Sequence, residues 1–472
     1  MSTKLPDIKT NFSDWYNDVV YQAEVVDHSP VRGTMVIRPY GYSMWENIVK
    51  ILDAKIKATG HQNASFPLFI PESFLKKEAQ HVEGFAPELA VVTHAGGKEL
   101  EEPLVVRPTS ETIIHHMFAR WIKSYRDLPM KINQWANVVR WEMRTRPFLR
   151  TSEFFWQEGH TAHETLKEAE QEVMLMLNEY VDLAQNYLAI PVITGQKSES
   201  EKFAGADKTF TFEGIMPDGK ALQMGTSHLI SRNFARAFEM KYQTRDGALE
   251  YPYLTSWGAT TRLIGAMIMT HGDQKGLVIP PRIAPIQVVI VPILVGDKKQ
   301  TVLDASQEIA RILGTEIRLF VDTDEQKTPG AKFYQWELKG VPLRIEVGPR
   351  DLENNQIILV TRLGEKITLS RQDLSVSTVH EILETIQQEL FARADERLIS
   401  NWHQGEKLSQ FGPIMKEANG AYQTGWCLGA ACEAQLKEYQ ATVRCLLPDK
   451  TFAQCFGCNQ RSEGDIIVAK AY

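Results

Sequence analysis

The residues with the strongest chemical pattern lie in NVVRWEMRTRPFLRTSEFFWQEGHTAH, residues 137–163. Four arginines come first, and aromatic and polar side chains follow. Read as strands VVRWEM and FFWQEGH joined by an exposed tip, RTRPFLRTS, the stretch places alternate residues on one face. That face would carry Val138, Arg140, Glu142, Phe154, Trp156, Glu158 and His160.

Clustered guanidinium groups beside aromatic rings suit a nucleoside triphosphate. Arginine forks match phosphate oxygens in two-point geometry, and a phenyl ring can stack on a purine. The chain contains no GxxxxGK[ST] loop and no GxGxxG that opens a helix after a strand. A nucleotide site would therefore be built from side chains on a sheet. The same pattern equally fits an ordinary hairpin with a solvated face and core aromatics.

The cysteines form a second group, because all five lie between residues 427 and 458. Cys427 and Cys432 form a C-x4-C pair, and Cys455 and Cys458 form a C-x2-C pair. Such pairs suit a tetrahedral zinc site, and four thiolates would leave no open position for catalysis. The alternative is a set of unrelated buried thiols. Cys445 stands apart in ATVRCLL and is expected to be a buried strand residue.

The length, composition and net charge of the chain limit the kind of protein that can position these groups. Its 472 residues suit two or three domains, and 43% apolar with 24% charged residues is ordinary for a globular protein. We find no apolar run of about 18 residues and no apolar signal core at the N-terminus, so we expect no membrane contact and a cytoplasmic protein. The net charge of -7 argues against a sequence-independent nucleic-acid coat protein.

The first region mixes helices and strands up to about residue 282. SMWENIVKILDAKIKATG has helical apolar spacing, and ELAVVTHAGGKELEEPLVVRP predicts a hairpin turning at Gly96-Gly97. RPTSETIIHHMFARWI predicts a helix capped by Thr109 or Ser110. LIGAMIMTHG predicts a buried segment before the proline-rich break IPPRIAP.

The second region, residues 284–395, alternates apolar strand runs with helical segments, which predicts a small α/β sheet. Thr328 and Pro329 are expected to begin one of its helices. STVHEILETIQQELFARAD predicts a long helix that leads into the cysteine-containing region, residues 400–472.

Several motifs, in order, resemble one family. RWE, TSEFFWQEGHTAH and WGATTRLIGAMIMTHGD resemble motifs 2 and 3 of class II aminoacyl-tRNA synthetases, and SPVRGTMVIRPYGYSMWENI resembles motif 1, with Pro39 at the dimer interface. RPTSET, WQEGHTAH, QMGTSHL and KGVPLRIEVGPRD resemble the prolyl-tRNA synthetases of archaeal/eukaryote-like type. The resemblance runs from about residue 15 to the end.

This resemblance implies a class II α+β catalytic domain with an antiparallel sheet over 1–282, an α/β anticodon-binding domain over 283–397 and a small zinc-binding α+β domain over 398–472. It implies a proline–tRNA ligase that makes prolyl-adenylate from L-proline and ATP with Mg2+, then transfers the prolyl group to the 3' end of tRNA(Pro). It also implies a homodimer.

The resemblance gives two arginines catalytic roles. Arg140 would lie between the proline carboxylate and the α-phosphate, where a fixed cation offsets the repulsion of two anions, and Arg262 would bind the far phosphate. The implied ATP residues are Arg140, Glu142, Arg150, Thr151, Phe154, Gln223, Thr226, Thr260 and Arg262. The implied proline residues are Thr109, Glu111, Arg140, Trp156, Glu158, His160, Phe203 and His228.

Some of these residues have simpler readings. Glu111 alone could favour a helix N-terminus, and His228 alone could be structural. The implied anticodon contacts are Phe333, Arg344, Glu346 and Arg350, and each also fits the solvated edge of a small sheet. The family also carries a structural zinc, matching the four paired cysteines. In relatives with this ending, the carboxylate of Tyr472 folds back towards the active site.

One departure from bacterial-type relatives has consequences. Residues 152–256 separate motif 2 from motif 3 and leave no room for the large editing insertion. Because a compact apolar pocket discriminates by only about 1–3 kcal/mol per methylene, we expect alanine to be activated. The alternatives are a class II enzyme for threonine, glycine or histidine, a non-catalytic paralogue that binds tRNA or a protein, and a metalloprotein built around the cysteines.

Overall fold

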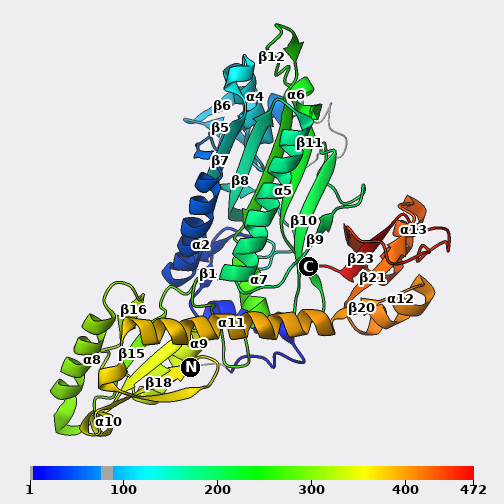
Figure 1. Cartoon of the computed structure of the whole chain (residues 1–472). Helices are drawn as coiled ribbons and strands as arrows, with labels where there is room; N and C mark the ends of the chain where they lie inside the picture. Colours follow the sequence, from blue (N-terminus) through cyan, green and yellow to red (C-terminus); the bar gives the residue numbers. More distant parts are fainter. Residues whose placement is uncertain (1–3, 76–88) are drawn as a thin grey trace.

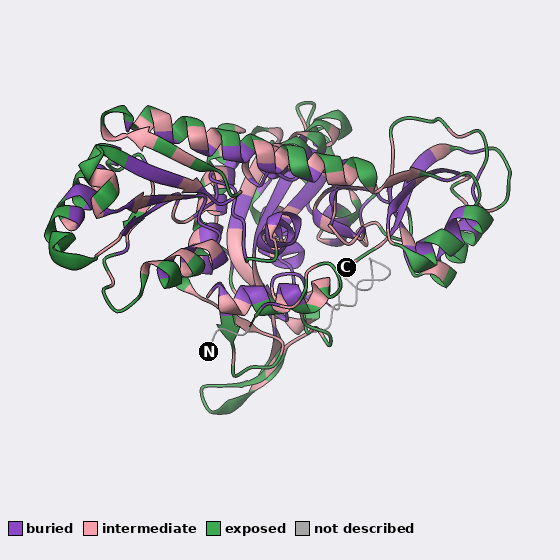
Figure 2. Ribbon diagram, turned by 90° about the horizontal axis from the view of Figure 1, so that it is seen from below, coloured by how far each residue is buried: buried purple, intermediate pink, exposed green. Residues whose placement is uncertain are grey.

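The computed structural model of the chain describes residues 4–75 and 89–472. In Figure 1 a large sheet stands above a five-stranded sheet, and helix α11 (Val376–Ser400) runs beneath the large sheet towards the C-terminal region. Buried residues gather in the strands of both sheets, whereas peripheral helices present exposed faces (Figure 2). None of the helices in the described part of the chain is long and apolar enough to cross a bilayer.

The large sheet has eleven strands in the order β20-β21-β23-β22-β9-β10-β11-β14-β8-β7-β3. The part from β9 to β7 is antiparallel, as predicted for the first region. The strands of this part are β7 (Met130–Val139), β8 (Glu153–His163), β9 (Ile193–Gln196), β10 (Lys208–Ile215), β11 (Ala221–Ser231) and β14 (Tyr253–Thr260). Strand β3 (Gln62–Asn63) pairs with β7 in parallel at the edge of the sheet.

The predicted strand VVRWEM is wrong beyond Val139, where β7 ends. Arg140 and Glu142 therefore lie in the loop that leads to β8. The expectation of an exposed tip is correct for Arg144, Thr145 and Arg150. It is wrong for Phe148 and Leu149, which are only 2% and 3% exposed and belong to the main core. Burial of these two apolar side chains folds the loop back against the protein.

Helices cover the large sheet. They are α2 (Pro39–Ala58), α4 (Glu111–Trp121), α5 (Leu166–Asp182) and α7 (Arg262–His271), and the predictions of helices at 43–60 and 107–122 and of a buried segment at 263–272 are confirmed. Ser110 occupies the N-cap of α4, but its hydroxyl does not cap the helix; it donates instead to Glu158. Gly159 of β8 is required by packing, because a Cβ there would lie 2.0 Å from the Trp257 ring.

The five-stranded sheet confirms the predicted α/β region. Its strands are β15 (Val288–Pro292), β16 (Leu319–Val321), β17 (Leu343–Val347), β18 (Gln356–Thr361) and β19 (Lys366–Ser370), with helices α8 (Lys299–Leu313), α9 (Pro329–Leu338) and α10 (Pro349–Glu353). Strand β15 is parallel to both neighbours, and β17, β18 and β19 are antiparallel. The Thr328 hydroxyl accepts from the Ala331 N–H and Pro329 begins α9, as predicted.

The C-terminal region extends the large sheet rather than forming a separate one. Its elements are β20 (Trp402–Gln404), α12 (Leu408–Glu417), β21 (Ala421–Trp426), α13 (Ala430–Gln435), β22 (Ala441–Leu446) and β23 (Gly464–Lys470). The junction is a single pair, Leu446 with Gln196 of β9. The C-terminus then returns to the large sheet (Figure 1), where Ala471 pairs with Ala221.

Smaller elements complete the first region. They are α1 (Phe12–Gln22), α6 (Asn233–Ala237), β1 (Val26–His28), β2 (Met35–Ile37), β4 (Phe69–Pro71), β5 (Val91–Ala95), β6 (Lys98–Val106), β12 (Tyr242–Gln243) and β13 (Leu249–Glu250). The hairpin of β5 and β6 turns at Gly96 and Gly97, both with positive φ, as predicted.

Candidate active site

A cavity of about 560 Å3 opens on one face of the large sheet. Every residue predicted to contact ATP or proline lines it. These residues are Thr109, Glu111, Arg140, Glu142, Arg150, Thr151, Phe154, Trp156, Glu158, His160, Phe203, Gln223, Thr226, His228, Thr260 and Arg262. They come from β8, β11, β14, the starts of α4 and α7, the loop after β7 and the connection between β9 and β10. Antiparallel register therefore assembles groups that are far apart in sequence.

Guanidinium groups collect at one end of the cavity. Arg262 is held by two backbone carbonyls, with Nε donating to Leu149 O at 3.2 Å and Nη1 to Gln223 O at 3.1 Å. Burial, together with the nearby Arg150 and Arg140, lowers the pKa of Arg262 to about 10. Arg262 is still protonated at neutral pH. Glu142 Oε2 lies 3.7 Å from Arg150 Nη1, so this end of the cavity keeps a net positive charge that an anionic ligand would relieve.

Arg140 lies between this cationic end and two carboxylates. Its Nε donates to Pro108 O at 2.9 Å, and its guanidinium lies 5.3 Å from the centre of the Trp156 ring. Burial lowers the pKa of Arg140, and Glu111 and Glu158 partly restore it. Arg140 is nevertheless solvent-accessible through the cavity. It can therefore meet a ligand without moving.

A buried carboxylate network forms the other end. Glu158 is 2% exposed and accepts hydrogen bonds from the Ser110 hydroxyl and from Gln134 Nε2 at 2.8 Å, while His160 Nε2 lies 3.3 Å from it. Glu111, the first residue of α4, accepts from the Thr109 hydroxyl. These hydrogen bonds fix both carboxylates in place, facing the cavity. Together they supply negative charge for a cationic group.

Beside these carboxylates lies a neutral imidazole. His228 Nδ1 and Nε2 each lie 2.9 Å from a hydroxyl, those of Thr209 and Thr226. Burial, reinforced by His160, lowers the pKa of His228 to about 3, so the ring is uncharged at neutral pH. The Phe203 ring packs 4.8 Å from it. This corner is compact and largely apolar.

Among the described residues, three that line the cavity, Trp156, His160 and Trp257, carry an unsatisfied ring nitrogen, and the first two lie at the carboxylate end. Trp156 Nε1 and His160 Nδ1 are buried and have no hydrogen-bond partner within the described part of the chain. Buried polar groups are normally paired, so these two atoms are available to a ligand.

The sequence reasoning missed several lining residues, among them Thr209, Glu201 and Ser256. Thr209 lies opposite His228 in the register of β10 and β11, which no local pattern reveals. The C-terminus also reaches this region: Arg150 Nη2 lies 3.4 Å from Tyr472 O, and the Tyr472 ring lies 5.8 Å from the Arg146 guanidinium.

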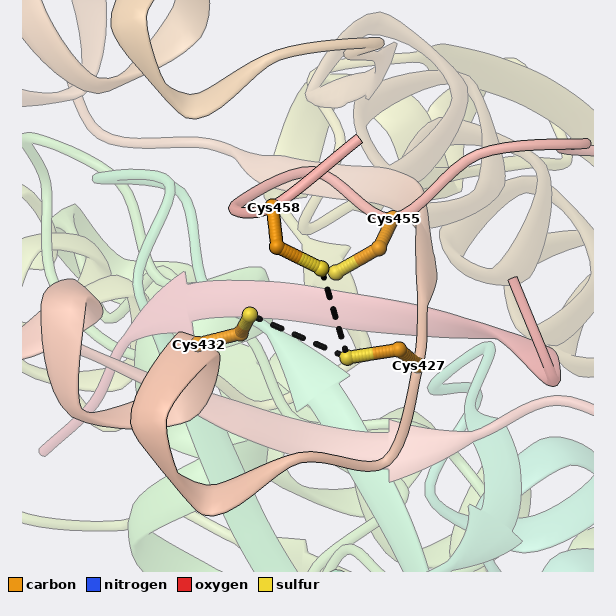
Figure 3. Close-up of side chains that lie close together, drawn as sticks. All are labelled: Cys427, Cys432, Cys455 and Cys458. Atoms are coloured by element: carbon orange, nitrogen blue, oxygen red, sulfur yellow. Dashed lines mark hydrogen bonds between the residues drawn. The ribbon is translucent and has the colours of Figure 1, made fainter. Parts of the chain in front are cut away.

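The four paired cysteines converge at one point in the C-terminal region. Their sulfur atoms point towards one another (Figure 3) and all lie within 4.8 Å. Cys427 Sγ is 3.7 Å from the sulfurs of both Cys432 and Cys458. This is too long for a disulfide, but it matches the separation of about 3.8 Å that Zn–S bonds of about 2.3 Å give in a tetrahedron. Cys445 lies apart and is buried, as expected.

One cysteine thiol of this cluster is set up for ionisation. Burial acts to raise the pKa of Cys455, but backbone N–H groups of Cys458 and Gly457 donate to its sulfur, and the pKa is lowered to about 7. Thiolates are the form that binds a metal. The donor set therefore fits a tetrahedral zinc ion.

Three of the four residues predicted to contact the anticodon lie together. Arg344 pairs with Glu346 at 2.8 Å and stacks on the Phe333 ring at 4.3 Å. Arg350 is exposed and lies on α10, apart from these contacts. Strand β17 and helix α9 thus carry a combined aromatic and charged patch formed by Phe333, Arg344 and Glu346.

Two family models match the chain. The model described as "tRNA synthetase class II core domain (G, H, P, S and T)" matches residues 92–271, and "Anticodon binding domain" matches residues 287–385. The first match contains most of the cavity residues. The second contains the five-stranded sheet.

Two similar proteins match the chain over nearly its whole length. "Proline--tRNA ligase 2" of Clostridioides difficile is 49% identical, covering 100% of this chain and 98% of its own, and "Proline--tRNA ligase" of Chlorobium phaeobacteroides is 54% identical over 95% and 93%. A crystal structure of prolyl-tRNA synthetase from Cryptosporidium parvum, complexed with halofuginone and AMPPNP, matches with a TM-score of 0.94 and 40% identity over 99% of both chains. The chain therefore belongs to the proline–tRNA ligase family of class II aminoacyl-tRNA synthetases.

Proposed function

We propose that the cavity converts L-proline and ATP to prolyl-adenylate and then transfers the prolyl group to the 3' end of tRNA(Pro), releasing AMP and diphosphate. The observation that carries this proposal is the presence of Arg140 and Arg262 in the same cavity as two buried carboxylates. A zwitterionic amino acid and a polyanionic nucleotide would each meet groups of opposite charge.

The nucleotide would occupy the cationic end. Arg262 would bind the far phosphate, and Arg150, Thr151, Gln223, Thr226 and Thr260 would line its path. Phe154 would stack on adenine beside Glu142. Mg2+ bound with the nucleotide would offset the charge of the phosphates, and Gln223, which lines the cavity, is the candidate side chain to help hold it.

Proline would occupy the carboxylate end. Its secondary ammonium would meet Glu111 and Glu158, and its compact ring would fit against Trp156, Phe203 and the neutral His228. Thr109 and His160 complete this end. Arg140 would lie between the carboxylate of proline and the α-phosphate. Because that carboxylate is already ionised, the first step needs positioning and charge stabilisation rather than a proton acceptor.

The rest of the chain would serve tRNA binding and stability. Residues 1–282 would form the catalytic domain, 283–397 the anticodon-binding domain and 398–472 the zinc-binding domain. The patch of Phe333, Arg344 and Glu346, with Arg350 nearby, would contact the anticodon bases. Cys427, Cys432, Cys455 and Cys458 would hold one structural zinc ion. The enzyme would act as a cytoplasmic homodimer, as the motif 1 resemblance implies.

The same proposal includes misactivation of alanine. Residues 152–256, all of them described, form α5, α6 and strands that mostly belong to the large sheet. Alanine is smaller than proline and carries the same ammonium and carboxylate, so we expect alanyl-tRNA to form. We also expect the purified protein not to hydrolyse supplied alanyl-tRNA. Rapid deacylation would refute this part of the proposal.

The central test is proline-dependent ATP–pyrophosphate exchange without tRNA. We expect exchange with proline, weaker exchange with alanine, and none with threonine, glycine or histidine. Arg140→Ala should lower turnover by about a hundredfold to a thousandfold, the range found when a fixed group that stabilises transition-state charge is removed. Exchange driven by another of these amino acids, or an unchanged rate in Arg140→Ala, would refute the proposal.

A further inference from the structure

The segment 197–206 connects β9 to β10 and meets two different parts of the molecule. Glu201, Phe203 and Ala204 line the cavity at its carboxylate end. The start of the segment meets α13, the helix that carries Cys432 of the cysteine cluster. The position of these cavity residues is therefore linked to the C-terminal region.

One carboxylate makes the most direct contact. Glu433 Oε1 accepts hydrogen bonds from the hydroxyls of Ser198 and Ser200, both at 2.7 Å. Ser198 is 2% exposed, so its hydrogen bond is shielded from water. Glu433 directly follows Cys432 in α13. Two hydroxyls bound to one oxygen fix the direction in which the segment leaves β9.

Buried charged groups fix Lys197, the residue before Ser198. Lys197 Nζ donates to the backbone oxygen of Arg444 at 3.0 Å and lies 3.3 Å from Glu213. Arg444, on β22, pairs with the same Glu213 at 2.8 Å. All three side chains are buried. The segment therefore begins from a rigid junction, and Glu433 acts on the residues between that junction and the cavity.

We infer that Glu433 is a positioning residue for the amino-acid end of the cavity. By binding Ser198 and Ser200 it sets where Glu201 and Phe203 lie, and Phe203 in turn packs on His228. This inference rests on the proposed proline site. Without Glu433, proline must order the segment when it binds, and that ordering weakens binding. The nucleotide end is built on other elements, α7 and the loop before β8.

The test is Glu433→Ala in the full-length, zinc-containing protein. In ATP–pyrophosphate exchange we expect KM for proline to rise about tenfold, equivalent to about 1.4 kcal/mol, with kcat and KM for ATP nearly unchanged. Glu433→Gln keeps an oxygen acceptor and should restore most of the affinity. Glu438→Ala is the matched control, because Glu438 pairs with Lys416 on the exposed surface of the same region.

A double-mutant cycle identifies the partners. Ser198→Ala combined with Ser200→Ala should raise KM for proline as Glu433→Ala does, and joining all three changes should add nothing further. Hydrogen exchange at residues 197–206 should become faster in Glu433→Ala at full zinc content. An unchanged KM for proline with unchanged hydrogen exchange, or additive effects in the cycle, would overturn the inference. If the unsubstituted protein shows no proline-dependent ATP–pyrophosphate exchange, the proposed function is refuted instead. The hydrogen-exchange rates at residues 197–206 would still decide the role of Glu433.

Discussion

The cationic end of the cavity and the cysteine cluster each concentrate groups of one charge sign, but the two sites differ in enclosure. Arg140, Arg150 and Arg262 border about 560 Å3 of open space. The four sulfurs all lie within 4.8 Å of one another and leave room for a single ion. The open site suits ligands that enter and leave, whereas the closed one suits a permanent counter-ion. In both sites the like charges indicate a ligand of opposite charge. The volume around them indicates whether that ligand exchanges with solvent or stays bound.

The largest expected effect removes a cation from the open site. Arg262→Ala should lower the turnover of proline-dependent pyrophosphate exchange by about a hundredfold to a thousandfold, because the phosphates lose a fixed positive charge. Arg144→Ala, on the exposed part of the loop between β7 and β8, is the control and should leave exchange without tRNA unchanged. Equal rates in the two variants would remove the basis for treating this end as a phosphate site.

The next effect removes a donor from the closed site. Cys432→Ser should lower bound zinc well below one ion per chain and destabilise the protein by several kcal/mol, because structural zinc contributes about 10–16 kcal/mol of binding free energy in small domains. Metal analysis and thermal unfolding measure the two results. Cys445→Ser, a buried cysteine outside the cluster, should retain the zinc. Loss of zinc in both variants would contradict the assignment of ligands.

A smaller effect concerns the chain terminus, which connects the two regions. Deleting Ala471 and Tyr472 should slow proline activation several-fold, because Arg150 loses the oxygen of Tyr472 and becomes free to leave the cavity. Tyr472→Phe keeps both the ring and the terminal carboxylate and is the control. Unchanged pyrophosphate exchange after the deletion would show that the terminus has no role in activation.

The smallest effect is a pH dependence of the stability of residues 1–282, the part of the chain that contains the cavity. Burial lowers the pKa of His163 to about 4 and of His271 to about 3. Below pH 6.5 the unfolded chain therefore binds protons that the folded protein does not. Stability should fall as the pH drops from about 6.5 to 4, by up to about 1.4 kcal/mol per pH unit for each residue.

Denaturant unfolding at pH 7 and 5.5 measures this loss. Metal analysis of the same samples separates it from acid release of zinc. His271→Gln keeps a donor for Leu188 O, which now lies 2.8 Å from His271 Nε2, and should reduce the pH dependence. Equal stability at both pH values with zinc retained would contradict the expectation.

Sequence reasoning succeeded where local patterns or motifs carried the information. Alternation along β8 placed Trp156, Glu158 and His160 on one face, and the cysteine spacing identified a cluster that the structure assembles. It failed where distant residues decide the outcome. The end of β7 at Val139 depends on the burial of Phe148 in the main core, beside Gly265 of α7. The sequence of a hairpin alone does not reveal this contact.

Long-range pairing was also beyond the sequence. The Ser110 hydroxyl would satisfy a helix N-terminus by local rules, but it donates to Glu158 on a strand that is distant in sequence. The buried group of Lys197, Glu213 and Arg444 joins residues separated by more than two hundred positions. Strand β19 lacked a sufficiently apolar run to be recognised.

The joining of the C-terminal strands to the large sheet has a consequence for self-association. An exposed sheet edge can pair with another molecule, and natural proteins reduce that hazard with very short edge strands. Here the open edge of β9 is covered by β22, and the sheet finishes in β3 at one margin and β20 at the other, strands of two and three residues. A protein shortened before β20 would present β9 as a bare template and should aggregate more readily than the whole chain.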